Sequence, residues 1–212
     1  MSIKGGERRD EQALNCKRKT IFIKGPFLPD GMAKLRKGVA YRALKRPYTR
    51  KSKFKKKAFI RGVPVCKVIR FDMGAVQKQD SFLYTVQLQT KVDLQIRHNA
   101  LESARQTCNR LMEGTVGKSD YAMKVRVYPH HVLRENVLAT GAGADRMSTG
   151  MAASFGKVVG IAAQLRAKQP IFDIYCNAQH LPTAKQAMVR AKNKLPCPCM
   201  IVITKNSDVK AK

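Results

Sequence analysis

The sequence predicts an α+β fold, a two-layer sandwich in which two helices pack on one side of a mostly antiparallel sheet, with a basic extended N-terminal arm. From about residue 61 onward, strand-like and helix-like patterns alternate, and two helical segments carry an apolar stripe. The residues before about position 60 are basic, rich in glycine, proline and lysine, and lack sustained periodicity. A length of 212 residues suits one compact domain with an additional segment, or at most two small domains.

The clearest strand signal covers residues 82–96. Its even positions, from Phe82 to Ile96, are apolar except for Thr90, and most of the odd positions are polar. A period of two indicates one buried face and one solvated face. The run is long for one strand, so we expect a bend or a hairpin to interrupt it. Further strands are expected at residues 123–128, 158–165, 171–176 and 199–204.

The first helix is expected to follow the long strand directly. Asn99 can cap its start, with Glu102 reaching back to the free backbone amides. Gly114 can end it in a left-handed turn. One face of this helix is expected to be apolar, since it is formed by apolar residues that recur at helical spacing: Leu101, Ala104, Cys108, Leu111 and Met112.

The second helix is expected over residues 184–195. Thr183 and Gln186 have the spacing of a capping box, and Pro196 ends the helix. Its apolar stripe consists of Ala184, Ala187, Met188, Ala191 and Leu195, and its outer face is basic.

The charge of the chain indicates a polyanionic partner. Its 42 Lys and Arg residues outnumber 14 Asp and Glu residues, for a formal net charge of +28. Nucleic acid is the commonest such partner, and release of its counterions would drive binding. An anionic membrane is the competing partner. No apolar run approaches the roughly 18 residues of a membrane-spanning helix, and the start lacks the apolar region of a secretory signal. We expect a cytoplasmic protein.

The most basic stretch, residues 31–71, contains fifteen Lys and Arg residues and no acid. Tyr41, Tyr48, Phe54 and Phe59 are interleaved among the cations. Cations contact phosphates and aromatic rings stack on unpaired bases, so this stretch favours RNA. Segments of this composition order on their polyanion rather than fold alone. The alternative is a solvated tail that only raises solubility, but such a tail needs no aromatic residues.

A glycine-rich segment, residues 139–156, is the second candidate site. Its glycines would let the backbone approach phosphates closely. It is not a nucleotide-binding fingerprint, because Gly141 and Gly143 lack a third glycine at the right spacing and no Gly-Lys-Ser or Gly-Lys-Thr follows. A mobile surface loop is an equal alternative. Arg146 can pair with Asp145 or reach a phosphate.

The remaining candidate chemistry is sparse. The chain has six cysteines, and Cys197 and Cys199 are the only close pair, so we favour buried or half-buried thiols in a reducing cell over a zinc site. His130 and His131 would point to opposite faces of a strand, so we expect one packed and one exposed histidine rather than a joint metal site. No catalytic constellation, cofactor fingerprint or metal-ligand set is apparent.

Several long motifs of the chain resemble those of one family. They are RPYTRKS (46–52), GVP (62–64), FDMG (71–74), QIRHNALESAR (95–105), VGKSDYAMKVRVYPHHVLREN (116–136), ATGAGADRMSTGM (139–151) and FGKVVG (155–160). The family is the large-ribosomal-subunit protein L-sixteen in its archaeal and eukaryotic form (L-ten-e), and the motifs are more similar to its archaeal members. The resemblance runs from about residue 32 to about residue 205.

The resemblance implies a two-layer α+β sandwich with a non-catalytic role in the cytoplasmic ribosome. It implies binding to large-subunit rRNA, including the 5S region, between the central protuberance and the peptidyl transferase region. The glycine-rich loop, residues 139–151, would point toward the peptidyl transferase centre and face tRNA. The other implied partners are neighbouring ribosomal proteins and ribosome assembly factors, with no membrane.

The expected RNA contacts combine the basic residues with the resemblance. They are Arg36, Lys37, Arg42, Lys45, Arg46, Tyr48, Arg50, Lys51, Lys53, Arg61, Arg97, Arg126, Arg134 and Lys157. The expected tRNA-facing residues of the loop are Thr140, Gly141, Gly143, Asp145, Arg146 and Ser148.

The chain departs from the family pattern in two places. Archaeal relatives tend to carry two arginines where this chain has Ala152 and Ala153, which puts phosphate contacts there in doubt. Relatives also begin near MAKLRK, which starts here at Met32. Residues 1–31 are therefore either a lineage-specific extension or the product of a wrongly assigned start codon, which we favour. The expected organisation is this segment, an arm over residues 32–60, a domain over residues 61–205 and a basic tail over residues 206–212.

Two other function classes compete with a ribosomal role. An RNA-modifying or RNA-processing enzyme would use the arm to capture its substrate, but it should show clustered carboxylates or a cofactor fingerprint. A DNA-compacting or membrane-surface protein fits the charge, but not a folded α+β core with a glycine-rich loop.

Overall fold

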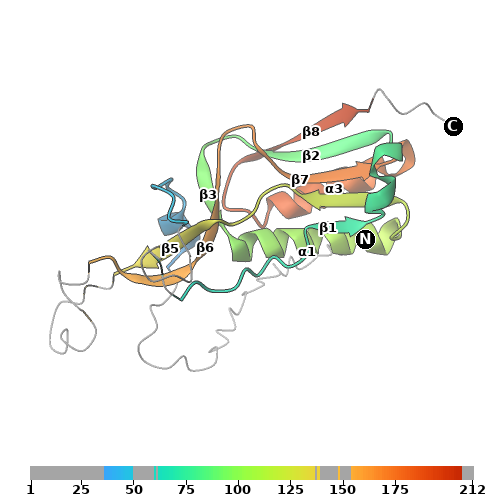
Figure 1. The fold of residues 1–212 in the computed structure, drawn as a ribbon. Helices are drawn as coiled ribbons and strands as arrows, with labels where there is room; N and C mark the ends of the chain where they lie inside the picture. The colour runs from blue at the N-terminus through green and yellow to red at the C-terminus, as the bar shows by residue number, and fades with distance from the viewer. Residues whose placement is uncertain are drawn as a thin grey trace, which may run out of the picture. The chain divides into compact units, whose positions relative to one another are not determined.

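The computed structural model describes residues 36–49, 60, 62–136, 138, 148 and 154–206. Within these ranges the chain forms two antiparallel sheets and two α-helices, which confirms the predicted α+β class (Figure 1). The predicted single sheet is instead divided into a five-stranded sheet and a three-stranded sheet.

The five-stranded sheet carries the helices. All of its neighbouring strands pair antiparallel. In spatial order the strands are β1 (Asp72–Gly74), β4 (Tyr121–Val125), β7 (Pro170–Cys176), β2 (Tyr84–Thr90) and β8 (Cys199–Lys205).

The three-stranded sheet has β6 (Lys157–Leu165) between two edge strands, β3 (Leu94–Arg97) and β5 (His131–Glu135). The long alternating run is interrupted at residues 91–93, as expected, because β2 and β3 enter different sheets. Asp93 holds the turn: its carboxylate accepts a hydrogen bond from Ala167 N–H at 2.6 Å.

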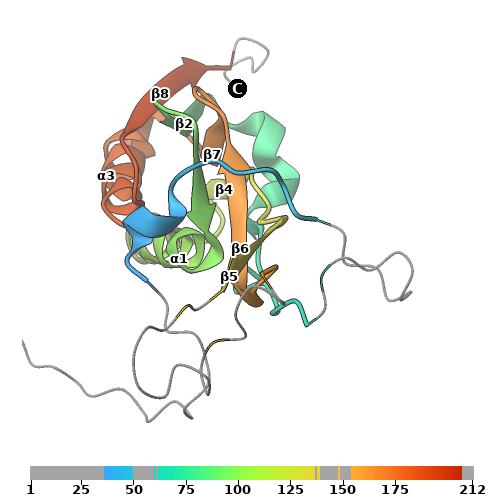
Figure 2. The same ribbon diagram turned by 90° about the vertical axis from the view of Figure 1, so that its left-hand side faces the viewer.

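Helices α1 (His98–Thr115) and α3 (Leu181–Lys192) pack against each other and cover one face of the five-stranded sheet (Figure 2). Alanines at their contact allow the helices to approach closely. The predicted apolar stripes are confirmed, since Leu101, Ala104 and Met112 of α1 join Ala187 and Met188 of α3 in the main core.

The expected start of α1 is wrong. The helix begins at His98, and the preceding extended residue, Arg97, makes no side-chain capping bond. β3 runs directly into the helix, so Asn99 lies inside the first turn, and its buried Oδ1 has no hydrogen-bond partner in the described structure. Gly114 does not end the helix either; the left-handed residue is Gly117, with φ of +89°.

The expected bounds of the second helix are also shifted. α3 begins at Leu181, directly after a short 3-10 turn, Ala178–His180, and ends at Lys192. Thr183 therefore lies within the first turn and no side-chain capping bond forms. Pro182 in the first turn pre-sets the backbone angle for helix entry.

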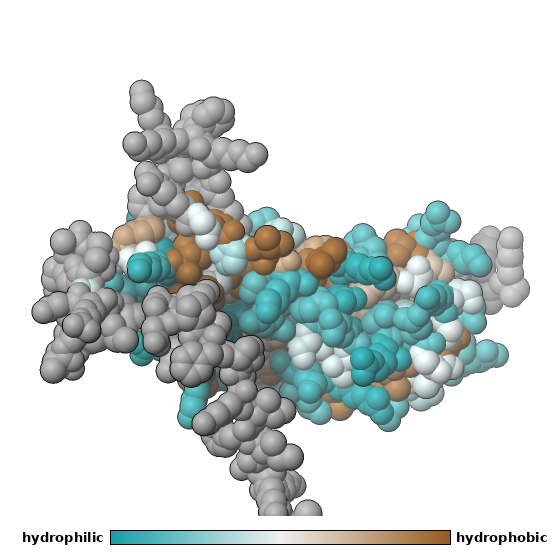
Figure 3. All heavy atoms as spheres, turned by 90° about the horizontal axis from the view of Figure 1, so that it is seen from below, coloured by the Kyte–Doolittle hydropathy of each residue, from teal (hydrophilic) through white to brown (hydrophobic). Residues whose placement is uncertain are grey.

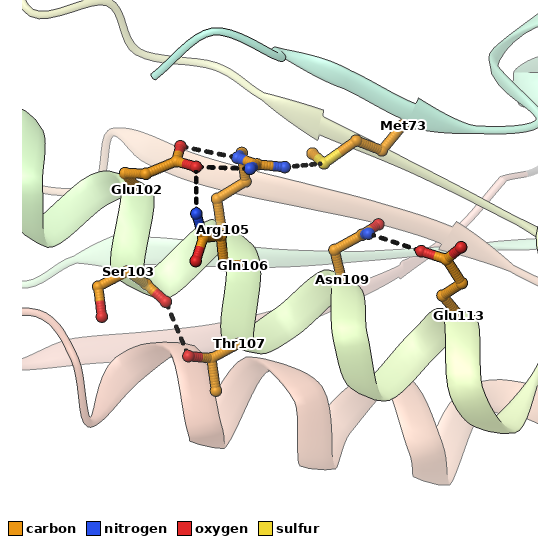
Figure 4. Close-up of polar contacts among 8 residues, drawn as sticks. All are labelled: Met73, Glu102, Ser103, Arg105, Gln106, Thr107, Asn109 and Glu113. Atoms are coloured by element: carbon orange, nitrogen blue, oxygen red, sulfur yellow. Dashed lines mark hydrogen bonds and ion pairs between the residues drawn. The ribbon is translucent and has the colours of Figure 1, made fainter. Parts of the chain in front are cut away.

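The outer face of α1 is held by polar contacts (Figure 4). Arg105 donates from Nε and Nη2 to the carboxylate oxygens of Glu102, at 2.8 and 2.6 Å. Its Nη1 lies 3.0 Å from Met73 Sδ on β1, and Gln106 Nε2 donates to Glu102 at 2.8 Å. The bonds from Arg105 hold the pKa of Glu102 below its usual value, although burial opposes this. Arg105 thus ties α1 to the edge of the sheet.

Candidate RNA interface

The described part of the arm, residues 36–49, lies across both edges of the three-stranded sheet. Gln95 N–H on β3 donates to Arg42 O at 3.1 Å, and Val132 N–H on β5 donates to Tyr48 O at 3.0 Å. Tyr48 N–H donates in turn to His131 Nδ1 at 3.0 Å. The arm supplies partners for edge-strand amides. This part of the arm therefore differs from the expectation that it orders only on its polyanion.

The anchored backbone leaves the cations of the arm at the surface. Tyr41, by contrast, is buried, with the Arg97 guanidinium 5.1 Å from its ring centroid. Exposed cations on a fixed backbone are suited to phosphate contacts. Five of the predicted RNA-binding residues belong to this exposed set: Arg36, Lys37, Arg42, Lys45 and Arg46.

A cavity of about 280 Å³ opens beside the arm. It combines cations with aromatic rings, the two kinds of group that contact phosphates and unpaired bases. Four predicted residues line it, namely Arg36, Lys45, Tyr48 and Arg134. Tyr41, one of the aromatic residues expected to stack on bases, also lines it but is buried. Three further lining residues were not assigned to a site from the sequence: Gln95, His131 and Glu135.

Glu135 is the acidic residue that lines this basic cavity. Its side chain is 11% exposed and lies 2.5 Å from Arg36 Nε. Tyr41 O–H also donates to it, at 3.3 Å. The hydrogen bond to Glu135 raises the pKa of Arg36. Glu135 thus holds the first described residue of the arm against β5.

Arg134 contacts two aromatic rings that are nearly perpendicular to each other. Its guanidinium carbon lies 3.9 Å from the ring centroid of Tyr48 and 3.7 Å from that of Phe155. Nη1 also donates to Phe155 O at 2.5 Å. Stacking of this kind stabilises a cation against aromatic faces. Arg134 therefore joins the arm, β5 and the end of the glycine-rich segment, and its contact with RNA stays a prediction.

The two adjacent histidines differ as expected. His131 is 4% exposed, whereas His130 is exposed with its ring 4.7 Å from that of Tyr128. Burial lowers the pKa of His131, and the positive charges of Arg134 and Lys45 lower it further. A neutral His131 is consistent with its role as the acceptor for Tyr48 N–H.

Three predicted residues lie outside both the arm and the cavity lining. Arg126 follows β4, and its Nε is 3.4 Å from Oδ2 of the buried Asp173 on β7. Burial raises the pKa of Asp173, and Arg126 opposes that rise. Lys157 is exposed at the start of β6, in register with Glu135, and Arg97 lies over Tyr41.

Several predicted residues cannot be placed. Ser148 is described and half-buried. The following lie outside the described residues: Arg50, Lys51, Lys53 and Arg61 of the arm, and Thr140, Gly141, Gly143, Asp145 and Arg146 of the loop.

Sequence reasoning missed the residues that build the cavity around the cations. Acids are scarce in this chain, so an acid at position 135, next to Arg134, could have indicated that Glu135 holds a nearby cation in place. Gly156 was another: its φ is +78°, and a Cβ there would lie 2.8 Å from the Glu135 carbonyl carbon. Only glycine permits this close approach of position 156 to β5, and the approach places Phe155 over Arg134.

The surface offers little support for other site types. Figure 3 shows a largely hydrophilic face, with apolar groups along one margin. Among the described residues, no group of three or more His, Cys, Asp or Glu side chains is placed to hold a metal ion. No helix in the described part of the chain is long and apolar enough to cross a membrane.

Comparison with known proteins identifies the family. The model of ribosomal protein L16p/L10e matches residues 45–202. Large ribosomal subunit protein uL16 of Methanosphaerula palustris is 44% identical over 167 residues, covering 78% of this chain and 92% of that protein. The uL16 proteins of Methanocella arvoryzae and Archaeoglobus fulgidus are 46% and 42% identical, covering 74% and 80% of this chain and 90% and 92% of their own lengths. The chain therefore belongs to the ribosomal protein L16p/L10e family, whose members are structural ribosomal proteins and not enzymes.

Proposed function

We propose that this chain is a structural constituent of the large ribosomal subunit that binds large-subunit rRNA through its arm and the adjoining cavity. One observation carries the proposal: the backbone of residues 36–49 is fixed across the sheet edges while its cations stay exposed. A pre-ordered row of cations loses less conformational entropy on binding than a free tail. Family membership supports ribosomal RNA as the polyanion.

The cavity gives the arm a second mode of contact. Lys45 and Arg36 at its wall can neutralise phosphates, and Tyr48 lines the same cavity. Unpaired bases of RNA stack on aromatic rings, whereas a paired duplex does not present them. We therefore propose that the cavity receives a single-stranded or bulged part of the rRNA.

The finer placement rests on the family resemblance. We propose binding near the central protuberance, including the 5S region, with the glycine-rich loop of residues 139–151 toward the peptidyl transferase centre and tRNA. Neighbouring ribosomal proteins and assembly factors would be the protein partners. Glycines that let the backbone approach phosphates, together with Arg146, support the loop assignment.

A charge-matched pair of variants tests the role of the arm. Replacing Lys37, Arg42 and Arg46 with alanine should weaken binding of the purified chain to large-subunit rRNA, and should lower the slope of log affinity against log salt by about one per lost phosphate contact. The matched control replaces three exposed cations of α3 instead: Lys185, Arg190 and Lys192.

The control separates a specific surface from overall charge. We expect the arm variant to lose about ten-fold or more in affinity at 0.1 M salt, which corresponds to about 1.4 kcal/mol, while the α3 variant changes much less. Equal losses in the two variants would show that binding follows net charge and not the arm.

A further inference from the structure

The two cysteines at the start of β8 lie in contact. Cys197 is half-buried and Cys199 is buried, and their Sγ atoms are 3.3 Å apart. The chain bends through residues 195–197 before it enters β8 at Cys199. The two Cα atoms are separated in the chain only by Pro198.

We propose that Cys197 and Cys199 form a redox-active dithiol, which small disulfides oxidise reversibly to an intramolecular disulfide. A disulfide has an S–S length of about 2.0 Å and tolerates Cα separations up to about 6.8 Å. The two sulfurs need to approach by roughly a further 1.3 Å, which rotation of the side chains can supply. Closing so short a loop costs little chain entropy.

The two thiols are electrostatically unequal. The hydrogen bond from the Cys197 thiol lowers the pKa of Cys199, and the positive charge of Lys192 lowers it further, although burial opposes both. The same hydrogen bond, together with burial, raises the pKa of Cys197. The reactive form of cysteine is the thiolate. The hydrogen bond therefore favours the thiolate at Cys199 over the thiolate at Cys197, which is the more accessible of the two.

The greater exposure of Cys197 sets the order of the exchange, because only its sulfur can be reached by a small disulfide. Cys197 Sγ passes its proton to Cys199 Sγ and attacks one sulfur of the small disulfide, whose S–S bond breaks and releases a first small thiolate. Cys199 then loses its proton to solvent, and its thiolate attacks Cys197 Sγ, displacing the second small thiolate. Both released thiolates take up protons from solvent. In total, two cysteine thiols are oxidised and one small disulfide is reduced to two thiols.

The surroundings favour a reversible bond. Lys91 N–H donates to Pro198 O at 3.1 Å, and Cys199 is in register with Thr90. The strand pairing thus holds the backbone on one side of the proposed ring. A disulfide strained by such a fixed backbone is easier to reduce than a relaxed structural one.

Two buried cysteines provide internal controls. Burial raises the pKa of Cys108 to about 12 and that of Cys176 to about 11. They therefore stay protonated at neutral pH. Cys66 is half-buried like Cys197 and provides a control of the same exposure class.

The test equilibrates the purified full chain with mixtures of oxidised and reduced glutathione, followed by acid quenching, alkylation and trypsin. Cleavage after Lys194 and Lys205 places both cysteines in one peptide, residues 195–205. We expect this peptide to lose two alkylation sites and the mass of two hydrogens, and to regain both on addition of reduced glutathione. Cys108 and Cys176 should stay fully alkylated.

Single substitutions separate the roles of the two thiols. Cys199→Ser should accumulate a mixed disulfide with glutathione at Cys197, because the resolving thiol is absent. Cys197→Ser should form at least about ten-fold less adduct, since Cys199 is buried. Cys66→Ser should close the bond as the unchanged chain does. Circular dichroism checks that each variant is folded.

Two results would overturn the proposal. One is that Cys197 and Cys199 of the folded chain both stay reduced at a ratio of oxidised to reduced glutathione that forms the disulfide in the urea-unfolded chain. The other is a folded Cys199→Ser variant that forms no adduct at Cys197.

Discussion

At the scale of single residues, the chain uses its few acids as fixed points for its many cations. Glu135 holds Arg36, Glu102 holds Arg105, and the buried Asp173 lies against Arg126. A cation held in this way gains a defined position, and its remaining donors point in a fixed direction. The net charge therefore comes from the cations that have no such partner.

The Glu102–Arg105 pair gives a pH-dependent prediction. The folded-state pKa of Glu102 is lowered, so its contribution to stability is complete above the ordinary value of about 4.3 and is lost as the pH falls through the folded-state pKa. Glu102→Gln should reduce the free energy of unfolding by about 1 kcal/mol at pH 7, and the difference should shrink below about pH 4. Urea unfolding at a series of pH values measures both.

Glu113 provides the matched control for Glu102. It also accepts hydrogen bonds, from Lys118 and Asn109, but its side chain is 41% exposed. Glu113→Gln should change the urea midpoint much less than Glu102→Gln at neutral pH, because solvent screens exposed pairs. A difference between Glu102→Gln and the unchanged chain that is independent of pH would contradict the assignment.

At the scale of elements, the arm and the three-stranded sheet form one unit, linked through His131. His131 must be neutral at Nδ1 to accept from Tyr48 N–H. Its pKa is lowered in the folded chain, so protonation acts against the docked arm. Stability is then complete above the ordinary histidine pKa of about 6.5 and falls as the pH drops below it, until the folded-state pKa is reached.

Hydrogen exchange tests this linkage. The protection factors of the Tyr48 and Val132 amides, corrected for intrinsic exchange, should fall as the pH is lowered below about 6.5. Asn at position 131 keeps an acceptor without a titrating ring, so His131→Asn should remove this step. If the step persisted in His131→Asn, another group would be responsible for it.

Element prediction from the sequence succeeded where the periodicity was long. The stripes of α1 and α3 and the alternation in β2 were visible because burial imposes a period. β1 has three residues and β5 reads His-Val-Leu-Arg-Glu, so neither shows a clear alternation. The predicted helix caps were wrong because β3 leads directly into α1 and a 3-10 turn leads directly into α3. Alternation also shows which face of a strand is buried, but it does not show which strands pair. The sequence therefore predicted one sheet where the structure has two.

At the scale of the whole molecule, the charge of the chain predicted an RNA-binding surface at the arm. The exposed cations of the arm follow from composition, and two of them, Arg36 and Lys45, line the cavity. The cavity itself could not be predicted, because the contact between Tyr41 and Glu135 joins positions 94 residues apart. The family comparison supports RNA as the partner, and the geometry adds how the arm is held.

The glycine-rich loop supplies a prediction for the assembled particle. Deleting residues 140–148 should permit joining of the subunits, because the deletion leaves the arm and the described sheets intact. It should impair tRNA binding or translation, which filter binding and peptide synthesis by purified ribosomes measure. Normal translation by such ribosomes would show that the loop has no role in tRNA handling.

The central claim is that the arm and its cavity are the rRNA-binding surface. The most direct measurement is crosslinking of the chain to RNA in isolated native ribosomes, read at the level of single residues and nucleotides. The account predicts crosslinks from residues 36–49 and from the cavity lining to large-subunit rRNA, with single-stranded or bulged nucleotides at Tyr48. Crosslinks confined to the outer faces of α1 and α3, with none from the arm, would contradict it.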